Sequence, residues 1–235
     1  MIPSIVLLVL GAISSTFFII SKVTKYTFKT IVLKTIASLF FIALAITCIA
    51  YNQKDIIFGI VIILGLFFGL LGDVFLGFKY VIEKKKKLFI MLGMFAFLFG
   101  HVSYVTALSI KYYIPGNILF VFLPFILATV LTTTYLLVAP KLGIQLKKFT
   151  PFGASYIFCL TSVFSTALFM NILNRFNYVT LIMILVGSVF FATSDFMLTG
   201  SYFKDGERSK AYRAIYSVAY YIAQFLIAFS LLFIL

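Results

Sequence analysis

Charged residues are scarce in this chain of 235 residues, and acidic residues are the scarcest. Asp and Glu together number 6, Lys and Arg number 19, and charged residues make up 11% of the chain, whereas a soluble domain carries about 25%. Hydrophobic residues make up 63%. This balance excludes a soluble globular domain and a disordered chain, and it predicts an all-α, polytopic membrane protein whose main partner is the lipid bilayer.

Cysteine and histidine are almost absent as well. The two cysteines, Cys48 and Cys159, are too few for a secreted disulfide scaffold. Together with the single histidine, His101, they also argue against a zinc site with several Cys or His ligands. No P-loop and no G-x-S-x-G sequence occurs. We therefore expect no cofactor, and a single metal ion held by Asp73, Asp195 and His101 is the alternative to a metal-free site.

Eight stretches are long and apolar enough to cross a membrane as helices. Such a helix needs about 20 mostly apolar residues, whereas a barrel strand needs only about 10 residues of alternating character. The predicted helices span residues 3–20, 31–50, 56–78, 88–109, 118–139, 152–170, 178–198 and 214–235. Only short loops remain between them, so we expect one integral membrane domain over residues 1–235, a bundle of eight transmembrane helices.

Basic residues gather in alternate loops. The first, third, fifth and seventh predicted loops together carry 15 Lys and Arg, the other loops carry 3, and Lys34 lies just inside the second helix. Since cytoplasmic loops are enriched in Lys and Arg, we predict cytoplasmic odd-numbered loops and both termini outside. In a bacterium, the membrane would be the cytoplasmic one. A nucleic-acid partner is not expected, because such binding needs one large solvated basic face.

Two acidic residues lie inside predicted spans. Asp73 lies in GLFFGLLGDVFLGF of the third helix and Asp195 in GSVFFATSDFMLTG of the seventh, each close to the predicted cytoplasmic end. An ionisable side chain at membrane depth is costly and by default marks a functional site. The alternative is a carboxyl group that only hydrogen-bonds neighbouring helices. Two acids at similar depth on different helices favour a function.

Other polar side chains inside the predicted spans are directed toward these acids. His101 and Tyr104 share a face of the fourth helix, and Tyr220 and Gln224 share a face of the eighth. Because side chains lean toward the N-terminus of their helix, these four lean back toward the cytoplasmic side, whereas the two acids lean inward. His101 also fits a packing role. For Lys34, snorkelling to the headgroups competes with a contact to a phosphate or carboxylate group.

Five segments around these residues carry a resemblance to a known family. In chain order they are VLKTIASLFF with Lys34, GLFFGLLGD with Asp73, GMFAFLFGHVSY with His101 and Tyr104, FATSDF with Ser194 and Asp195, and YYIAQFLI with Tyr220, Tyr221 and Gln224. In these segments the chain resembles the YhhN-like family, which includes the mammalian transmembrane lysoplasmalogenases. Two positions depart from the family pattern: Thr35 follows Lys34 where a proline is usual, and Gly69 stands where a serine is frequent.

The resemblance implies hydrolysis of the vinyl ether bond of a lysoplasmalogen, which is a 1-alkenyl lysophosphatidylethanolamine or -choline. The products are a fatty aldehyde and the glycerophospho-headgroup. Protonation of the vinyl carbon yields an oxocarbenium ion that water captures, and glycosidases use two carboxyl groups for a comparable ion. We therefore predict a hydrolase in which Asp73 and Asp195 are catalytic, with neither of them assigned as the acid.

The remaining polar residues are predicted to bind or orient the substrate and water. They are Lys34, His101, Tyr104, Ser194, Tyr220, Tyr221 and Gln224. The lysophospholipid would enter from the cytoplasmic leaflet, with its phosphate near Lys34 and its tail between helices. Two alternatives stay open: a proton-coupled transporter, since intramembrane Asp residues are typical of proton relays, and a non-catalytic lipid-binding membrane protein. The sequence shows no inverted repeat, which many transporters have.

Overall fold

The computed structural model describes residues 1–116, 118–204, 206 and 208–235, and within them helices are the only regular elements. The long helices are α1 (Ile2–Thr24), α2 (Phe28–Asn52), α3 (Ile56–Phe78), α4 (Lys86–Tyr112), α5 (Leu119–Val138), α6 (Thr150–Leu173), α7 (Val179–Phe203) and α8 (Lys210–Ser230). Short 3-10 turns lie at Glu83–Lys85, Ala139–Leu142, Lys147–Phe149 and Leu231–Phe233. Among these described residues, eight helices are long and apolar enough to span a membrane, so the predicted all-α, eight-span architecture is confirmed.

Several helices extend beyond the stretches predicted from hydropathy. The first continues to Thr24 rather than ending at residue 20, and α7 continues to Phe203 rather than ending at residue 198. Backbone hydrogen bonds do not stop where the apolar stretch stops, so polar residues near the membrane interface continue the helix. Asp195 therefore lies eight residues before the end of α7, deeper than the three residues expected from the sequence.

The end of α8 differs in the opposite sense. This helix ends at Ser230 and a 3-10 turn follows, so the predicted span to residue 235 is too long. The side-chain amide of Asn52 donates hydrogen bonds to the carbonyl oxygens of Leu231, Leu232 and Ile234, at 3.3, 3.1 and 2.9 Å. It thereby satisfies carbonyl groups that a helix end leaves unpaired.

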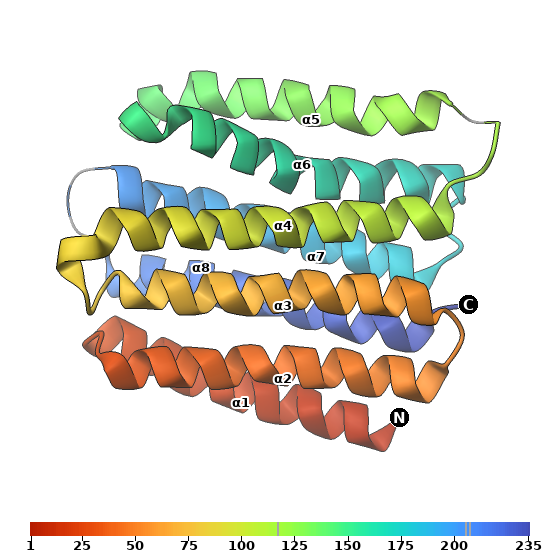
Figure 1. Ribbon diagram of the computed structural model, residues 1–235, viewed down its shortest axis with the longest axis horizontal. Coiled ribbons are helices and arrows are strands. Elements are labelled where there is room, and N and C mark those ends of the chain that lie inside the picture. Colours follow the sequence, from red (N-terminus) through yellow and green to blue (C-terminus); the bar gives the residue numbers. More distant parts are fainter. Residues whose placement is uncertain (117, 205, 207) are drawn as a thin grey trace.

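The helices run up and down in turn, so both termini lie at the same end of the bundle (Figure 1). The opposite end carries the connections α1–α2, α3–α4, α5–α6 and α7–α8, where most of the lysines and arginines occur. We call this end the basic end. The enrichment of Lys and Arg in cytoplasmic loops predicts that it faces the cytoplasm.

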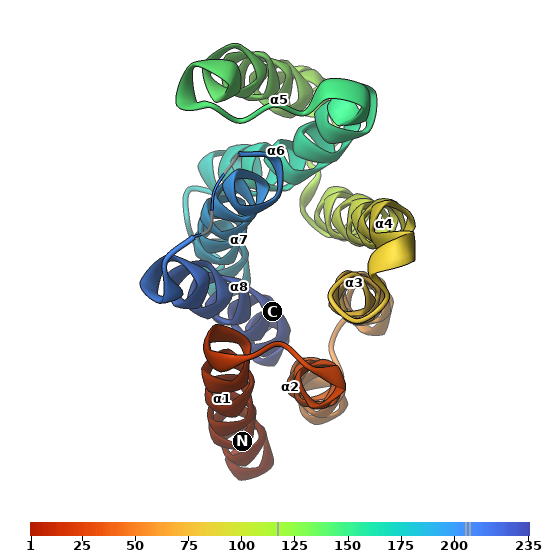
Figure 2. The same cartoon turned by 90° about the vertical axis from the view of Figure 1, so that its left-hand side faces the viewer.

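Seven of the helices form a closed ring when the bundle is seen along its long axis (Figure 2). Neighbouring helices pack in the order α1, α2, α3, α4, α6, α7, α8 and back to α1, and α5 lies outside this ring against α6. Helix α8 also reaches across the interior to α2 and α3. The ring therefore brings helices from both halves of the chain around one interior.

Glycines bring α3 and α4 together along the wall of the ring. A Cβ atom at Gly100 would lie 3.0 Å from the carbonyl oxygen of Gly65, and one at Gly72 would lie 2.5 Å from the ring of Phe97. Small residues at such spacings let membrane helices approach closely. Because these glycines have no side chains, the ring of Phe97 packs directly beside the segment of α3 that carries Asp73.

Candidate active site

The carboxyl group of Asp73 is the most highly coordinated polar group inside the ring. It is 1% exposed, and the Nζ atom of Lys34 lies 2.7 Å from its Oδ1 atom. The hydroxyl groups of Ser38 and Tyr220 donate hydrogen bonds to its Oδ2 atom at 2.5 and 2.7 Å. Lys34 and Ser38 lie four residues apart on one face of α2, and Tyr220 lies on α8. Three helices thus meet at one buried carboxyl group.

A chain of hydrogen bonds continues from Asp73 toward α4. The amide nitrogen of Gln224 donates to the hydroxyl oxygen of Tyr220 at 3.0 Å, and the hydroxyl of Tyr104 donates to the amide oxygen of Gln224 at 3.2 Å. Gly69 leaves room for this amide, since a Cβ atom there would lie 2.8 Å from Gln224 Nε2. Because the Tyr220 hydroxyl oxygen accepts a hydrogen bond from Gln224, its own proton is free to point at Asp73. Tyr220 is therefore the donor and Asp73 the acceptor in their hydrogen bond.

The carboxyl group of Asp195 has a different set of neighbours. It lies on α7 and is 5% exposed, and the hydroxyl of Tyr156 on α6 donates a hydrogen bond to its Oδ2 atom. Within the described residues, no lysine or arginine side chain lies within ion-pair distance of it. One carboxyl group is therefore paired with a cation, and the other faces a neutral phenol.

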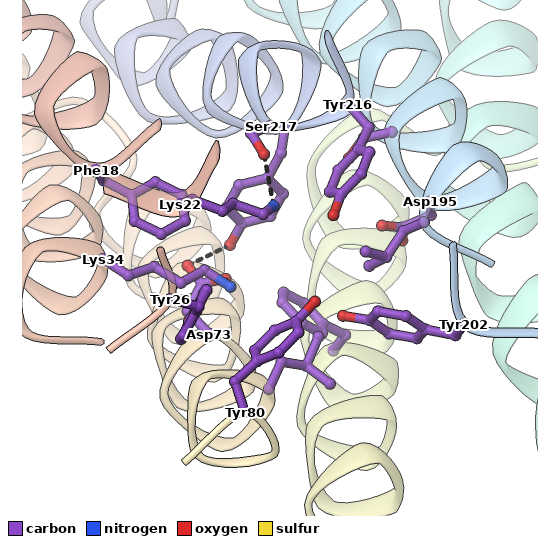
Figure 3. A pocket seen from close by; sticks show the side chains of 15 residues that line it. Phe18, Lys22, Tyr26, Lys34, Asp73, Tyr80, Asp195, Tyr202, Tyr216 and Ser217 are labelled. Carbon is purple, nitrogen blue, oxygen red and sulfur yellow. Dashed lines mark hydrogen bonds and ion pairs between the residues drawn. The ribbon is translucent and has the colours of Figure 1, made fainter. Parts of the chain in front are cut away.

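Both carboxyl groups line the same cavity, which has a volume of about 40 Å³. Figure 3 shows Asp73 and Asp195 on opposite sides of it, with tyrosine side chains around the space between them. Lys22, Lys34 and Ser194 also contribute to the lining. A buried water needs roughly 10–15 Å³ of such space and several polar partners. The cavity can therefore hold water between two carboxyl groups, which is the arrangement needed for acid-assisted hydrolysis.

The match to a known family covers nearly all of this architecture. A model of the YhhN family matches residues 29–231, from the start of α2 through the end of α8. The chain belongs to the YhhN family. Comparisons with curated proteins and with solved structures found no match. The region matched to the YhhN family contains both carboxyl groups, Lys34 and the hydrogen-bond chain to Tyr104.

The site residues predicted from the sequence fall into two groups in this YhhN-family structure. The first group lines the cavity itself: Lys34, Asp73, Ser194, Asp195 and Tyr220. The second group lies behind that lining. Tyr104 and Gln224 act on the cavity only through Tyr220, and Tyr221 donates a long hydrogen bond of 3.5 Å to the backbone carbonyl of Lys34.

His101 also lies behind the cavity rather than in its lining. It is 1% exposed, and its ring packs at 4.9 Å from the ring of Phe191 and 5.6 Å from that of Tyr156. Its Nε2 atom is buried without a hydrogen-bond partner in the described part of the chain. His101 thus packs against Tyr156, whose hydroxyl donates to Asp195, so its connection to that carboxyl group is indirect.

This position bears on the possible metal site. The described residues contain no group of three or more His, Cys, Asp or Glu side chains placed to hold a metal ion. His101 packs against aromatic rings instead of joining Asp73 and Asp195 in one donor set. The donor geometry therefore gives no support to the three-residue metal site considered from the sequence.

Several polar residues of the site were not predicted, among them Lys22, Ser38 and Tyr156. The predicted first span, residues 3–20, places Lys22 in a loop, yet Lys22 lies in α1, is 8% exposed and donates to Ser217 at 2.6 Å. Ser38 could have been found, since it lies one helical turn after Lys34. Tyr156 has no such sequence signal, because only the packing of α6 against α7 brings it to the site.

Proposed function

We propose that this YhhN-family protein is a membrane-embedded hydrolase that cleaves the vinyl ether bond of lysoplasmalogens. The observation that carries the proposal is that two carboxyl groups with different partners line one cavity that can hold water. Asp73 is paired with the Lys34 ammonium group, whereas Asp195 accepts a hydrogen bond from the Tyr156 hydroxyl. Vinyl ether hydrolysis needs a proton donor for carbon and an anion beside the cation that forms. A cavity within the membrane-spanning helices also suits a substrate that reaches the protein from the bilayer.

The different neighbours of the two acids support different roles. The Lys34 ammonium group and two hydroxyl donors stabilise the ionised form of Asp73. Asp195 is buried without a cation beside it, and burial of an isolated charge is strongly unfavourable. We therefore assign Asp195 as the proton donor and Asp73 as the anion that stabilises the oxocarbenium ion, as in the two-carboxyl solution of glycosidases.

The reaction proceeds in three steps. Asp195 transfers its proton to the outer vinyl carbon, and the positive charge that develops at the ether carbon is stabilised by Asp73. Water attacks that carbon and returns a proton to Asp195, which gives a hemiacetal. The hemiacetal then breaks its bond to the glycerol oxygen while its hydroxyl proton passes to that oxygen, and the products are a fatty aldehyde and a free glycerol hydroxyl group. The side chain of Tyr156 keeps Asp195 oriented throughout.

Substrate binding requires the cavity to open, because about 40 Å³ holds water but no glycerophosphate. An adjoining cavity of about 40 Å³ shares Phe97, Asp195 and Leu198 with the first and is lined mainly by apolar side chains of α4, α6 and α7. This second cavity is a suitable place for the first carbons of the alkenyl chain. The headgroup would then lie on the other side of the carboxyl groups, toward the basic end.

Aldehyde release by purified protein in detergent tests the proposal. The substrate is 1-alkenyl lysophosphatidylethanolamine, and the variants are Asp73→Asn and Asp195→Asn. General acid and base groups contribute about 100-fold to 10,000-fold to a rate, and each substitution should lower aldehyde release by that order. Asp55→Asn is the matched control, because Asp55 lies at the other end of α3, outside the cavity.

Two outcomes would contradict the proposal. Rates of Asp73→Asn and Asp195→Asn equal to that of the wild type would remove both acids from the chemistry. An absence of aldehyde from folded wild-type protein, together with proton flux in liposomes, would favour the proton-coupled transporter instead. The wild type is also assayed with a chelator, since chelator-sensitive release would give the acids a role as metal ligands.

A further inference from the structure

A vestibule of about 330 Å³ opens at the basic end next to the catalytic cavity. Its size falls in the range of small-molecule binding pockets. Four cationic side chains line it: Lys79, Lys86, Arg208 and Arg213. Tyr80 and Tyr202 line both the vestibule and the cavity that holds Asp73 and Asp195, so the two spaces adjoin at these two rings.

Lys79 is the most unusual cation of this vestibule. It is only 2% exposed, and its ammonium group lies over the rings of Tyr202 and Tyr80. It forms no ion pair within the described residues. Burial, and then the nearby cations Lys22 and Lys34, lower the pKa of Lys79 well below its usual value. Aromatic faces offset part of the cost of a buried cation, but a neighbouring anion would offset far more.

Arg213 on α8 is the second cation with unused capacity. Its Nε atom is buried and has no hydrogen-bond partner in the part of the chain that the structure describes. A guanidinium group offers several N–H donors in a planar arrangement that matches phosphate oxygens. Asp205 and Glu207, in the α7–α8 connection, lie outside the described residues.

Lys34, by contrast, is already occupied. Its ammonium group lies 2.7 Å from Asp73 and helps to keep that carboxyl group ionised in the proposed mechanism. A phosphate group that drew Lys34 away would leave a buried carboxylate unpaired, which is strongly destabilising. The phosphate contact expected for Lys34 from the sequence is therefore better made by other cations.

We propose that Lys79 and Arg213 form the binding site for the phosphate group of the substrate, so that the protein selects alkenyl lipids that carry a phosphate. This inference rests on the proposed function. The spacing supports it: Lys79 follows Asp73 by six positions, directly after the end of α3, which is about 9 Å along the helix axis. Six bonds join the ether carbon, whose charge Asp73 stabilises, to the phosphorus atom, and an extended chain covers about 7 Å over that number of bonds.

Two substrates with the same alkenyl chain measure this selectivity. One is 1-alkenyl lysophosphatidylethanolamine and the other is 1-alkenylglycerol, which has no phosphate. The quantity compared is the ratio of kcat/KM for the first to kcat/KM for the second. Loss of one charge-assisted hydrogen bond corresponds to about tenfold or more, so Lys79→Gln and Arg213→Gln should each lower the ratio by at least about tenfold. Lys141→Gln, an exposed lysine at the same end, should leave it unchanged.

Two results of this comparison would overturn the inference. The wild type could cleave both substrates equally well, or the two variants could lose activity toward both substrates in the same proportion. The second result would mean that the cations only support the fold. Since Lys79 is buried and its replacement can impair folding, Arg213→Gln, at a half-buried position, provides the independent variant.

A binding measurement separates this inference from the proposed function. Thermal unfolding of the purified protein in detergent is followed with glycerophosphoethanolamine, with inorganic phosphate, and in micelles that contain phosphatidylglycerol. We expect glycerophosphoethanolamine to raise the unfolding temperature of the wild type but not of Lys79→Gln or Arg213→Gln, whether or not aldehyde is produced. Stabilisation by inorganic phosphate alone, by phosphatidylglycerol alone, or by none of the three would each overturn the assignment to the substrate phosphate.

Discussion

The protein contains two Lys–Asp ion pairs in its described residues, and they lie at opposite ends of α3. Lys111 and Asp55 form one at 3.0 Å, with the Asp55 side chain 31% exposed. Lys34 and Asp73 form the other at 2.7 Å, with Asp73 1% exposed. Asp55 also accepts a hydrogen bond from the backbone N–H of Phe58 and so caps the start of the helix.

The two acids lie near opposite ends of α3, Asp55 at its N-terminus and Asp73 toward its C-terminus. An anion at a helix N-terminus is stabilised by the partial positive charge there, whereas no such benefit exists near the C-terminus. Asp55 occupies the favourable end, and its half-buried pair needs less desolvation than the Asp73 pair. Asp73 lies near the unfavourable end and is fully removed from water, where removal of either partner leaves a costly charge. Under the proposed function, the first pair stabilises the fold, whereas the second serves the chemistry of the site.

Removal of the Lys34 ammonium group should give the largest effect, and it tests the difference between the two ion pairs most directly. Lys34→Met leaves the Asp73 carboxylate buried and unpaired, so we expect a loss of about 3–5 kcal/mol in stability together with loss of aldehyde release. Thermal unfolding in detergent measures the first effect and the aldehyde assay the second.

The double variant Lys34→Met/Asp73→Asn provides the control for that experiment. It removes the unpaired charge, so it should recover most of the stability while it stays inactive. Failure of the double variant to recover stability would mean that Lys34 matters through packing, because the two side chains would then not act as an ion pair.

A second prediction concerns the hydroxyl group that Ser38 donates to Asp73. Ser38→Ala removes one charge-assisted hydrogen bond, which corresponds to about 1.5–3 kcal/mol, and we expect the rate of aldehyde release to fall about tenfold or more. Thr35→Ala, on the same helix but bonded only to a backbone carbonyl, is the matched control and should keep its rate. Equal rates for the two variants would show that the hydroxyl has no part in setting the state of Asp73.

The capping role of Asp55 predicts a smaller and purely structural effect. Asp55→Ala removes the acceptor for Phe58 N–H, and loss of such a cap costs about 1 kcal/mol. The free energy of unfolding should fall by that amount, while aldehyde release per folded molecule stays the same. A fall in activity without a fall in stability would contradict the division between the two ends of α3.

The smallest effect should come from the charge of Asp55 alone, measured as a function of pH. Burial raises the pKa of Asp55, but the hydrogen bonds from Phe58 and Lys111 outweigh burial and bring the pKa below its usual value. Because the pKa of Asp55 is lower in the folded state than in the unfolded state, its charge stabilises the fold at pH values above the unfolded pKa of about 3.9. This stabilisation is lost as the pH falls through the folded-state pKa.

Asp55→Asn keeps a capping side chain and removes only the charge. At neutral pH it should be less stable than the wild type by at most about 1 kcal/mol, and the difference in unfolding temperature should shrink as the pH is lowered toward 3. Lys111→Met should behave in the same way, since it removes the other partner of this half-buried pair. A difference that grows on acidification would contradict this account of Asp55.

Much of the fold follows from the sequence because a membrane imposes strong rules on composition. Eight apolar stretches and alternating basic loops predict eight helices, and only the helix ends differ. The scarcity of acids also makes Asp73 and Asp195 conspicuous, and both line the cavity. These features depend on local composition, which a sequence displays directly.

The partners of these acids depend on how helices pack, and the sequence does not display that. Lys34 fits a headgroup contact in the sequence, yet it pairs with Asp73 across two helices. His101 fits a place beside the acids, yet it lies behind Tyr156. Lys22 fits a loop, since hydropathy does not reveal that α1 continues far enough to place it in the cavity lining.

The closed ring of seven helices has a consequence for the order in which the site matures during synthesis. Helix α8 contacts both α7 and α1 and supplies Tyr220 to the carboxyl group of Asp73. Chains fold from the N-terminal side as they emerge from the ribosome, so Asp73 enters the bilayer well before its tyrosine has been made. Until α8 inserts and closes the ring, the Lys34–Asp73 pair lies in an open groove. Insertion of α8 therefore closes the ring of helices around the site and, in the same event, brings the Tyr220 hydroxyl to the carboxyl group of Asp73.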